Sequence, residues 1–244
     1  MTPTVFVFFI LSILAGSAGA QSGQQLIEKS LRNHALPTHI YEEQALVMTD
    51  RQGKLTVRTL RSYTIHHENE RKNLRVIETP SDAKGTAIYI VSNSQGKAYH
   101  SLPATSPAFG SNFTLADLET EQVKDFRYER EGDQVLERVL HYVLRAVPLD
   151  DSIIRRTGYH ERRLYLRKDN LFVSRIEYLD RHDRQTRRQT FRDPTPDDSG
   201  AWRPRMVLME DLRDGERSLL KVEHRVDSSD YVPATVFAGL RTMP

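Results

Sequence analysis

Apolar and polar residues alternate with a period of two along much of the chain after residue 41. In the segments 55–65, 164–167, 175–178 and 220–223, mainly apolar side chains occupy every second position and polar side chains lie between them. This alternation is typical of antiparallel strands that bury one face of a sheet. The sequence therefore predicts a mainly β (α+β) protein built around an antiparallel sheet with one apolar face.

Polar segments rich in Gly, Asn and Asp separate these strands. Such residues tolerate the backbone conformations that close hairpins, and strands joined in this way form a meander. The segment 136–147 is predicted to form one strand. Strand patterning resumes at Trp202 after the Pro-rich loop 194–200, so we expect a single domain over residues 21–244. The hairpin turns expected from the pattern are 50–53, 93–96, 131–133, 168–170 and 214–215.

A short helix is expected before the first strand. Ser22 and Gln25 have the spacing of a capping box, in which each side chain bonds the backbone N–H of the other residue. Apolar residues then recur on one side of a helix until Pro37, which cannot continue it. We therefore predict one amphipathic helix over 23–35.

The N-terminal residues have the features of an export signal. The apolar segment 5–14 is shorter than the roughly 20 residues that a membrane-spanning helix needs. Ala18-Gly19-Ala20 has the small-x-small pattern of a cleavage site, so residues 1–20 are expected to be a cleaved signal peptide. An uncleaved anchor is the alternative, because no Lys or Arg precedes the apolar segment. Cleavage and export predict a protein of the bacterial periplasm.

Charge and cysteine content exclude several classes of protein. The chain has no Cys, so no disulfide framework supports it, and 35 basic residues against 33 acidic ones do not suggest nucleic acid. The segment 155–192 is locally basic, with 12 Lys and Arg against five Asp and Glu. It is expected to be either a solvated outer strand face or a surface that meets an anionic partner.

No local motif for catalysis or metal binding is present. The chain lacks a Gly-x-Ser-x-Gly elbow, a phosphate loop and a His-Glu-x-x-His motif. His66 and His67 are adjacent on a predicted strand, so they point to opposite faces and cannot bind one metal together. We therefore expect a protein that is not an enzyme and that has no catalytic residues, no metal and no cofactor.

One ordered set of short motifs resembles a known family. Lys84–Ala87 begins an apolar strand, Leu102–Ala104 forms a Leu-Pro-Ala step, and a loop starts at Gly110–Thr114. Trp202–Pro204 follows much later. The order and spacing of these elements resemble the outer membrane lipoprotein-sorting proteins, periplasmic relatives of the carrier LolA. The Arg-rich insert that this family has before its Gly-Ser motif is missing here.

The resemblance implies a fold, a function and partners. The implied fold is a curved antiparallel half-barrel of LolA/LolB type, with helices and a lid loop over its concave apolar face. The implied function is that of a monomeric periplasmic carrier, which sequesters the acyl chains of lipids or lipoproteins for transport to the outer membrane. An inner-membrane transporter of the resistance–nodulation–division type is the partner that the family suggests. The alternatives are a sensing module like RseB, which binds a lipid or lipoprotein signal, and a scaffold subunit of an envelope complex.

The loop 103–120 and the helix 23–35 are the segments expected to cover the concave face. Large apolar residues in a loop suit either a lid over a cavity or a loop held on the core by its aromatic side chains. The residues predicted to line the cavity or the lid are Met48, Val57, Ile88, Ile90, Leu102, Phe109, Phe113, Leu115, Leu118, Leu140, Tyr142, Leu144, Leu164, Leu166, Ile176, Tyr178 and Trp202.

Overall fold

The computed structural model describes residues 21–240 except 68–69, 94–97 and 101. The signal peptide predicted over residues 1–20 lies outside the described residues, as does most of the turn predicted at 93–96. No helix in the described part of the chain is both long enough and apolar enough to cross a membrane.

The helix predicted near the N-terminus is confirmed as α1 (Gly23–Asn33). Its capping box is complete: the Gln25 N–H donates to Ser22 Oγ at 3.2 Å, and the Ser22 N–H donates to Gln25 Oε1 at 3.0 Å. Leu26 and Ile27 on the inner side of α1 are fully buried. The local sequence therefore specifies both the start of α1 and the face that it buries.

The strands form one large antiparallel sheet and a separate small hairpin. In the sheet the order is β5-β4-β3-β2-β1-β14-β13-β10-β9-β8-β7-β6, and β11 pairs only with β12. Sheet neighbours are consecutive in the chain except where β1 pairs with β14 and β13 pairs with β10. The predicted meander is thus correct for most of the sheet. The strands are β1 (His39–Thr49), β2 (Leu55–His67), β3 (Glu70–Thr79), β4 (Ala87–Asn93), β5 (Ala98–His100), β6 (Phe126–Leu136), β7 (Val139–Pro148), β8 (Glu161–Arg167), β9 (Val173–Leu179), β10 (Gln185–Arg192), β11 (Thr195–Pro196), β12 (Trp202–Arg203), β13 (Met206–Asp211) and β14 (Arg217–Val226).

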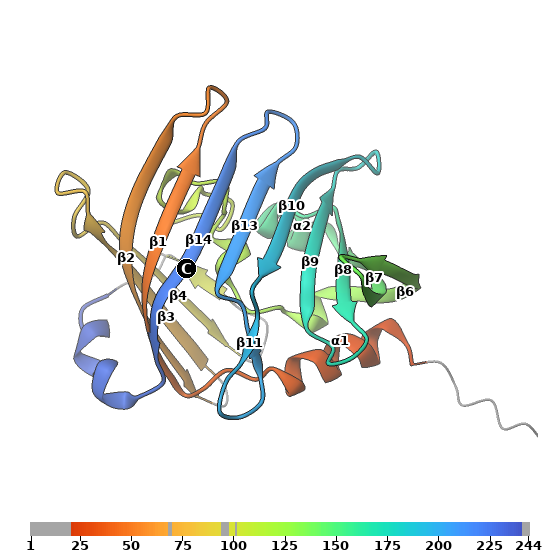
Figure 1. Ribbon diagram of the computed structural model, residues 1–244, viewed down its shortest axis with the longest axis horizontal. Helices are drawn as coiled ribbons and strands as arrows, with labels where there is room; N and C mark the ends of the chain where they lie inside the picture. The colour runs from red at the N-terminus through yellow and green to blue at the C-terminus, as the bar shows by residue number, and fades with distance from the viewer. Residues whose placement is uncertain (1–20, 68–69, 94–97, 101, 241–244) are drawn as a thin grey trace, which may run out of the picture.

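The sheet is strongly curved and does not close into a barrel. Its two edge strands are β5 and β6, which are consecutive in the chain. The segment between them, residues 102–125, therefore has to cross the sheet from one edge to the other, and we call it the crossing loop. It contains the 3₁₀ turns η1 (Ala108–Gly110), η2 (Ala116–Leu118) and η3 (Val123–Asp125). Figure 1 shows α1 lying along one end of the curved sheet.

The turn predicted at 131–133 and the single strand predicted over 136–147 are both wrong. β6 continues through Gly132, where the register with β7 shifts between Arg130 and Gly132, so the glycine lies in a β-bulge. The hairpin turn lies at Glu137 and Arg138, whose φ angles are 49° and 68°. A glycine serves a bulge as well as a turn, so its presence alone does not distinguish the two.

Three further short elements complete the fold. The helix α2 (Asp151–Thr157) connects β7 to β8, and the turns η4 (Ser229–Tyr231) and η5 (Ala234–Phe237) follow β14. The Asp150 side chain caps α2, and Gly158 ends it in the left-handed conformation. The core is one cluster that joins the concave face of the sheet, α1 and the crossing loop.

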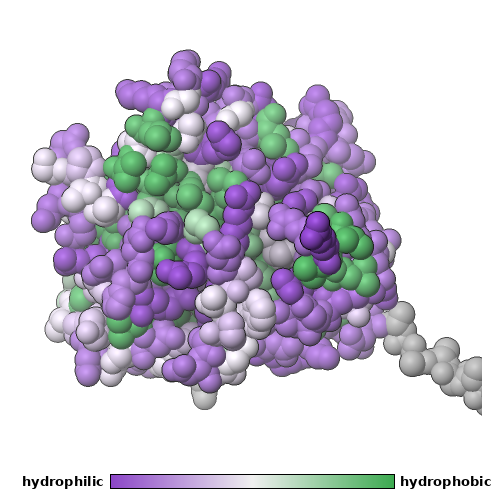
Figure 2. All heavy atoms as spheres, in the orientation of Figure 1, coloured by the Kyte–Doolittle hydropathy of each residue, from purple (hydrophilic) through white to green (hydrophobic). Residues whose placement is uncertain are grey.

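The outer face of the sheet carries an apolar stripe. The strand register places Val57 opposite Val47, Val47 opposite Leu219, and Leu219 opposite Leu208. In Figure 2 the molecule is largely hydrophilic, and apolar residues gather over the region of β1, β14 and β13. Because strand side chains alternate between faces, these residues point away from the core.

Candidate functional site: an apolar cavity beneath the crossing loop

A cavity of about 220 Å³, with an apolar floor and several charged side chains in its lining, lies between the concave face and its cover. The side chains of Leu164, Ile176, Tyr178 and Phe191 from β8, β9 and β10 form its floor. The cover consists of α1 and the crossing loop. The other residues that line the cavity are Ile27, Leu31, Ala116, Asp117, Glu119, Thr120, Glu121, Gln122, Phe126, Arg156, Thr157, Tyr159, Arg162, Val173 and Gln189.

An arginine of β8 holds the crossing loop from inside this cavity. Arg162 donates from Nη1 to Glu121 Oε2 at 2.9 Å and from Nη2 to Glu121 Oε1 at 2.6 Å. The guanidinium lies 4.1 Å from the centroid of the Phe126 ring and 4.8 Å from that of Tyr159. The Tyr128 hydroxyl donates to the same carboxylate. Both charges of this ion pair are therefore buried and hydrogen-bonded.

The ionisation of this pair follows from its surroundings. Burial opposes the charged form of Glu121, yet the Arg162 guanidinium and the Tyr128 hydroxyl hold the pKa of this carboxyl below its ordinary value. Burial likewise opposes the charged form of Arg162, but the Glu121 carboxylate raises its pKa above the ordinary value. The pair is thus ionised at neutral pH.

A second buried arginine holds the middle of the crossing loop. Arg187 of β10 donates to Asp117, whose side chain is fully buried, and to the Asn112 carbonyl at 3.1 Å. Asp117 Oδ1 also accepts from the Tyr159 hydroxyl at 2.7 Å, and Oδ2 accepts from the Thr114 N–H at 2.7 Å. This carboxylate therefore connects the loop backbone to β10 and to the segment between α2 and β8.

A third arginine holds the end of the crossing loop. Arg156 of α2 donates to Asp125 and, at 3.4 Å, to Glu119 Oε2. Burial raises the pKa of Asp125, although the Arg156 charge opposes that change. Segments on both sides of the cavity are thus joined by charge pairs in addition to apolar contacts.

These contacts correct part of the prediction for the basic segment 155–192. Arg156, Arg162 and Arg187 lie on the inner side of the sheet and bind the crossing loop. Arg163 has the predicted outward position and pairs with Glu131 at 3.0 Å. The segment is therefore neither wholly a solvated face nor a continuous docking surface.

The C-terminal end of α1 is anchored to the connection between β8 and β9 and to β12. Ser30 Oγ donates to the Leu171 carbonyl at 2.7 Å. The His34 ring bonds the Asn170 carbonyl through Nε2 at 3.0 Å and accepts from the Trp202 N–H at Nδ1, 3.1 Å away. A ring that accepts at Nδ1 while it donates at Nε2 is neutral. Burial lowers the pKa of His34, which agrees with this form.

The stability of the protein should depend on the protonation of His34. With its pKa lowered below the ordinary 6.5, the folded state binds fewer protons than the unfolded chain, so stability is full above this value and falls as the pH falls. We expect His34→Asn, which does not titrate, to lose about 1 kcal/mol less than the unchanged protein between pH 7 and pH 5. Urea unfolding at the two pH values measures this difference, and equal losses in both proteins would contradict it. Burial also lowers the pKa of His66 and His141, so part of the pH dependence should remain in the variant.

The structure places most of the predicted cavity residues in the core. Leu164, Ile176 and Tyr178 line the cavity. Trp202 lies in β12, half-buried, with the Arg167 guanidinium 5.3 Å from its ring centroid. The other predicted residues that are buried or half-buried in the same core, without lining the cavity, are Met48, Ile88, Ile90, Phe109, Phe113, Leu115, Leu118, Tyr142, Leu144 and Leu166.

Three predicted residues are not in the core, which corrects the expectation for them. Leu60 of β2 is buried on the inner face of the sheet. Residues 57 and 60 point to opposite faces, so Val57 points outward and is 53% exposed. Leu140 is 44% exposed, one residue beyond the part of β7 that pairs with β8. Leu102 is 47% exposed in the chain that leaves β5.

Sequence reasoning missed two kinds of site residue. Ile27 and Leu31 of α1 line the cavity, and their spacing on one helix face was a signal for this. The arginines that hold the crossing loop were missed because a charged residue in a strand is usually exposed. Arg162 and Leu164 are two residues apart and so point to the same face of the strand. Because Leu164 is an inward residue, this spacing was a signal that Arg162 also points inward.

The sequence of this chain is similar to that of one protein family. A family model described only as that of an uncharacterized protein matches residues 69–239. No curated protein matches the sequence.

Several solved structures share the fold. A domain from Vibrio parahaemolyticus, described as that of an outer membrane lipoprotein-sorting protein, has 19% identity and a TM-score of 0.76, over 88% of this chain and 97% of that one. A DUF1329 family protein from Desulfovibrio piger has 18% identity and a TM-score of 0.74, with the same coverage. A LolA superfamily protein from Nitrosomonas europaea has 17% identity and a TM-score of 0.65, over 84% of this chain and 93% of that one. The curved half-barrel predicted from the short motifs is thus confirmed.

Proposed function

We propose that this chain, which belongs to the family of uncharacterized proteins matched over residues 69–239 and has the LolA-like fold, reversibly binds acyl chains of lipids or lipoproteins. The observation that carries the proposal is the cavity with an apolar floor that lies between the concave face and a loop that crosses the sheet from edge to edge. A cavity covered in this way suits the binding of a chain that has to be kept from water.

The size of the cavity indicates that the structure is a closed state. Its volume of about 220 Å³ is below the roughly 300–1,000 Å³ of sites that enclose a small-molecule ligand. A whole acyl chain therefore requires the crossing loop, α1 or both to move outward. Each methylene that enters the site from water contributes roughly 0.8 kcal/mol, so a few methylenes suffice to shift the loop equilibrium.

The buried ion pairs suit a cover that has to open. A buried pair gains about as much from its mutual attraction as it loses in hydration, so exposing both charges together costs little net free energy. A cover held only by apolar contacts would lose all of their free energy on opening. The three arginines can thus orient the closed loop without making its release prohibitive.

We place the protein in the periplasm as a monomeric carrier toward the outer membrane, working with an inner-membrane transporter of the resistance–nodulation–division type. The resemblance of the short motifs supports this assignment, and so does the description of the Vibrio parahaemolyticus domain as part of a lipoprotein-sorting protein. Binding without catalysis is the activity that we propose for the cavity.

The proposal is tested by native mass spectrometry with lipid extraction of protein taken gently from a periplasmic fraction. We expect co-purifying acylated molecules with the unchanged protein and none with Val173→Trp, because the indole fills the space that Val173 lines. The matched control is Val57→Trp on the outer face, which should retain the bound molecules. A ligand-free mass with no uptake of added lipid, or equal loading of both variants, would refute the proposal.

A further inference from the structure

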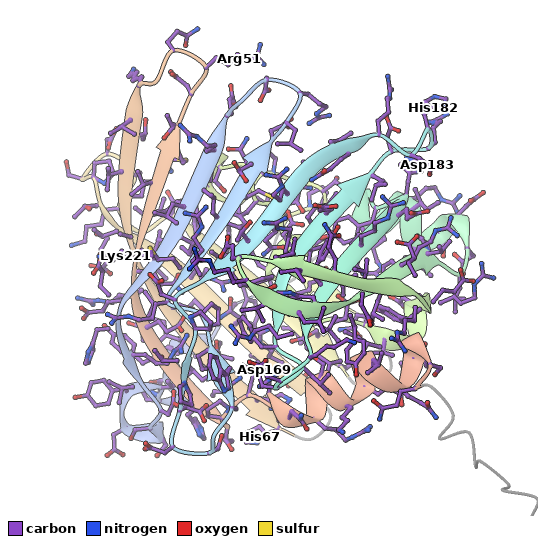
Figure 3. The ribbon with its side chains drawn as sticks, turned by 45° about the vertical axis from the view of Figure 1, so that its right-hand side comes forward. Arg51, His67, Asp169, His182, Asp183 and Lys221 are labelled. Carbon is purple, nitrogen blue, oxygen red and sulfur yellow. The ribbon has the colours of Figure 1, made fainter. Side chains whose placement is uncertain are left out.

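A second cavity of about 440 Å³ lies at the α1 end of the molecule, and we call it the polar basin. It is lined by the adjoining ends of β2, β3 and β4, by the first turns of α1 and by residues 120–124 of the crossing loop. His67, one of its residues, lies at this end of the sheet, whereas Arg51 and His182 mark hairpin tips at the other end (Figure 3). The basin thus opens beside the helix that covers the apolar cavity.

Arg71 lines the polar basin, and no described carboxylate lies within ion-pair distance of it. Its Nη1 donates to Thr120 Oγ1 at 2.7 Å, and its buried Nε has no hydrogen-bond partner among the residues that the structure describes. Burial lowers the pKa of Arg71, while the more distant Glu42 and Glu119 charges oppose the change. No ion pair within 4.0 Å joins Arg71 to any carboxylate of the described residues.

Arg75 lies four residues further along the same inward face of β3, beyond Asn73 and next to the residues that line the basin. It is only 8% exposed, its Nη1 donates to Asn73 Oδ1 at 2.5 Å, and no described residue accepts a hydrogen bond from its Nε. Burial, together with the neighbouring Arg71 charge, lowers the pKa of Arg75 to about 10. Two like charges therefore lie close together in the interior of the half-barrel, and the part of the chain that the structure describes provides no ion-pair partner within 4.0 Å for either.

The carboxylates around these arginines are engaged elsewhere. Glu121 is bound by Arg162, Glu70 pairs with Lys72 at 2.9 Å, and Glu42 pairs with Arg225. Glu28 of α1 accepts from the Gln24 side chain at 3.1 Å. Among the described residues, no carboxylate of the basin is thus bound directly to Arg71, although Glu28 and Glu70 line the same basin.

Buried charges in proteins are normally paired, because an unpaired one loses its hydration without compensation. Guanidinium groups with free N–H donors are suited to bind phosphate or carboxylate in a forked geometry. Arg71 and Arg75 share one face of the strand with Asn73 between them, and the Arg71 charge acts on Arg75, so the two long side chains can reach one anion from the same side. The arrangement therefore has the chemistry of an anion site that is built into the fold.

The basin and the apolar cavity share one wall. Thr120, Glu121 and Gln122 of the crossing loop line both. Thr120 is also the residue that accepts from Arg71. A movement of this short segment would therefore connect the apolar cavity with the arginines.

We propose that Arg71 and Arg75 bind the phosphate or carboxylate headgroup of an amphiphile whose acyl chain occupies the apolar cavity. This inference rests on the proposed function and specifies its ligand class: a single-chain or multi-chain amphiphile with an anionic group close to the acyl chain. The headgroup displaces Thr120 from Arg71, so binding at the basin and movement of the crossing loop are coupled. Neutral amphiphiles enter the same cavity but lack this contact.

The test compares oleoyl lysophosphatidic acid with mono-oleoylglycerol, which have the same acyl chain and differ in the phosphate. Dissociation constants from displacement of a fluorescent fatty acid should favour the phosphate lipid about ten- to hundredfold, because hydrogen bonds to charged groups are among the strongest. Arg71→Gln should reduce this preference to near unity and leave the affinity for mono-oleoylglycerol unchanged. The matched control is Arg127→Gln, whose side chain is 62% exposed on β6, and it should keep the preference.

Arg75→Met separates a binding role from a structural one. Removal of an unpaired buried charge should raise the midpoint temperature of the ligand-free protein and also abolish the preference for the phosphate lipid. A lowered midpoint together with an unchanged preference would show that Arg75 is structural, and would overturn the inference.

The remaining outcomes are equally decisive. Equal affinities of the unchanged protein for the two lipids, or a preference that survives both substitutions, would overturn the headgroup site but not the acyl cavity. Inorganic phosphate that binds as tightly as the phosphate lipid would show a site for the free anion, uncoupled from a chain. Binding of neither lipid would instead refute the proposed function itself.

Discussion

Arg162→Met should lower the free energy of unfolding by about 3–5 kcal/mol, the usual cost of breaking a buried ion pair by removing one partner. The Glu121 carboxylate would remain buried with only the Tyr128 hydroxyl as a partner, and two N–H donors, at 2.6 and 2.9 Å, would be lost. The aromatic rings of Phe126 and Tyr159 would also lose the cation between them. Equilibrium urea unfolding measures the change.

Two further variants show that the effect belongs to the pair. Arg163→Met changes the neighbouring arginine, which faces outward and pairs with Glu131, and should cost about 0–1 kcal/mol as exposed pairs do. Adding Glu121→Met to Arg162→Met should restore most of the loss, because apolar side chains of similar volume replace a buried pair at little cost. Losses that simply add in the double variant would contradict the coupling of these residues.

Asp117→Asn should lower the free energy of unfolding by about 3 kcal/mol, because Arg187 keeps a buried charge without a counter-charge. The amide keeps the shape of the carboxylate, so the change isolates the charge from the packing. The bonds affected are those from Arg187, from the Tyr159 hydroxyl and from the Thr114 N–H. We expect the loss to be local, with the crossing loop opening before the sheet unfolds.

Hydrogen exchange measures this local opening directly. Amides of residues 104–118 should lose more protection in Asp117→Asn than those of β1 and β14. Asp169→Asn is the control, since Asp169 lies in the exposed β8–β9 turn and pairs with Arg167 beside the solvent. It should change neither pattern. Uniform loss of protection across the sheet would show that Asp117 supports the global fold instead of the cover.

The two predictions concern the same physical question, which is how the cover stays closed and still opens. Arg162 and Arg187 hold different parts of the crossing loop, so their substitutions should differ in which amides become exposed. A carrier needs a cover whose open and closed states differ by only a few kcal/mol, because a ligand shifts the equilibrium only by its differential affinity.

The sequence by itself determined the local structure and the fold class. The capping box at Ser22 and Gln25 specified where α1 begins, and alternation of side chains specified the strands with one buried face. The order of the short motifs from Lys84 to Trp202 indicated the half-barrel that the solved structures confirm. The helix cap and the strand alternation depend on residues close together in the chain, so they can be recognised in a single sequence.

Tertiary structure alone decided what these elements contact. Gly132 sits in a bulge and not in a turn because its register with β7 is set by the whole strand pair. The inward parity of Arg162 was visible beside Leu164, but its partner Glu121 lies 41 residues away and is brought near only by the loop that crosses the sheet. Arg71 and Arg75 share a face of β3, yet the absence of a carboxylate partner for them in the described part of the chain depends on every element around them. Charged residues that are far apart in the sequence pair only when the fold brings them together, and no local pattern indicates such pairs. For this reason the site is defined only in the folded protein.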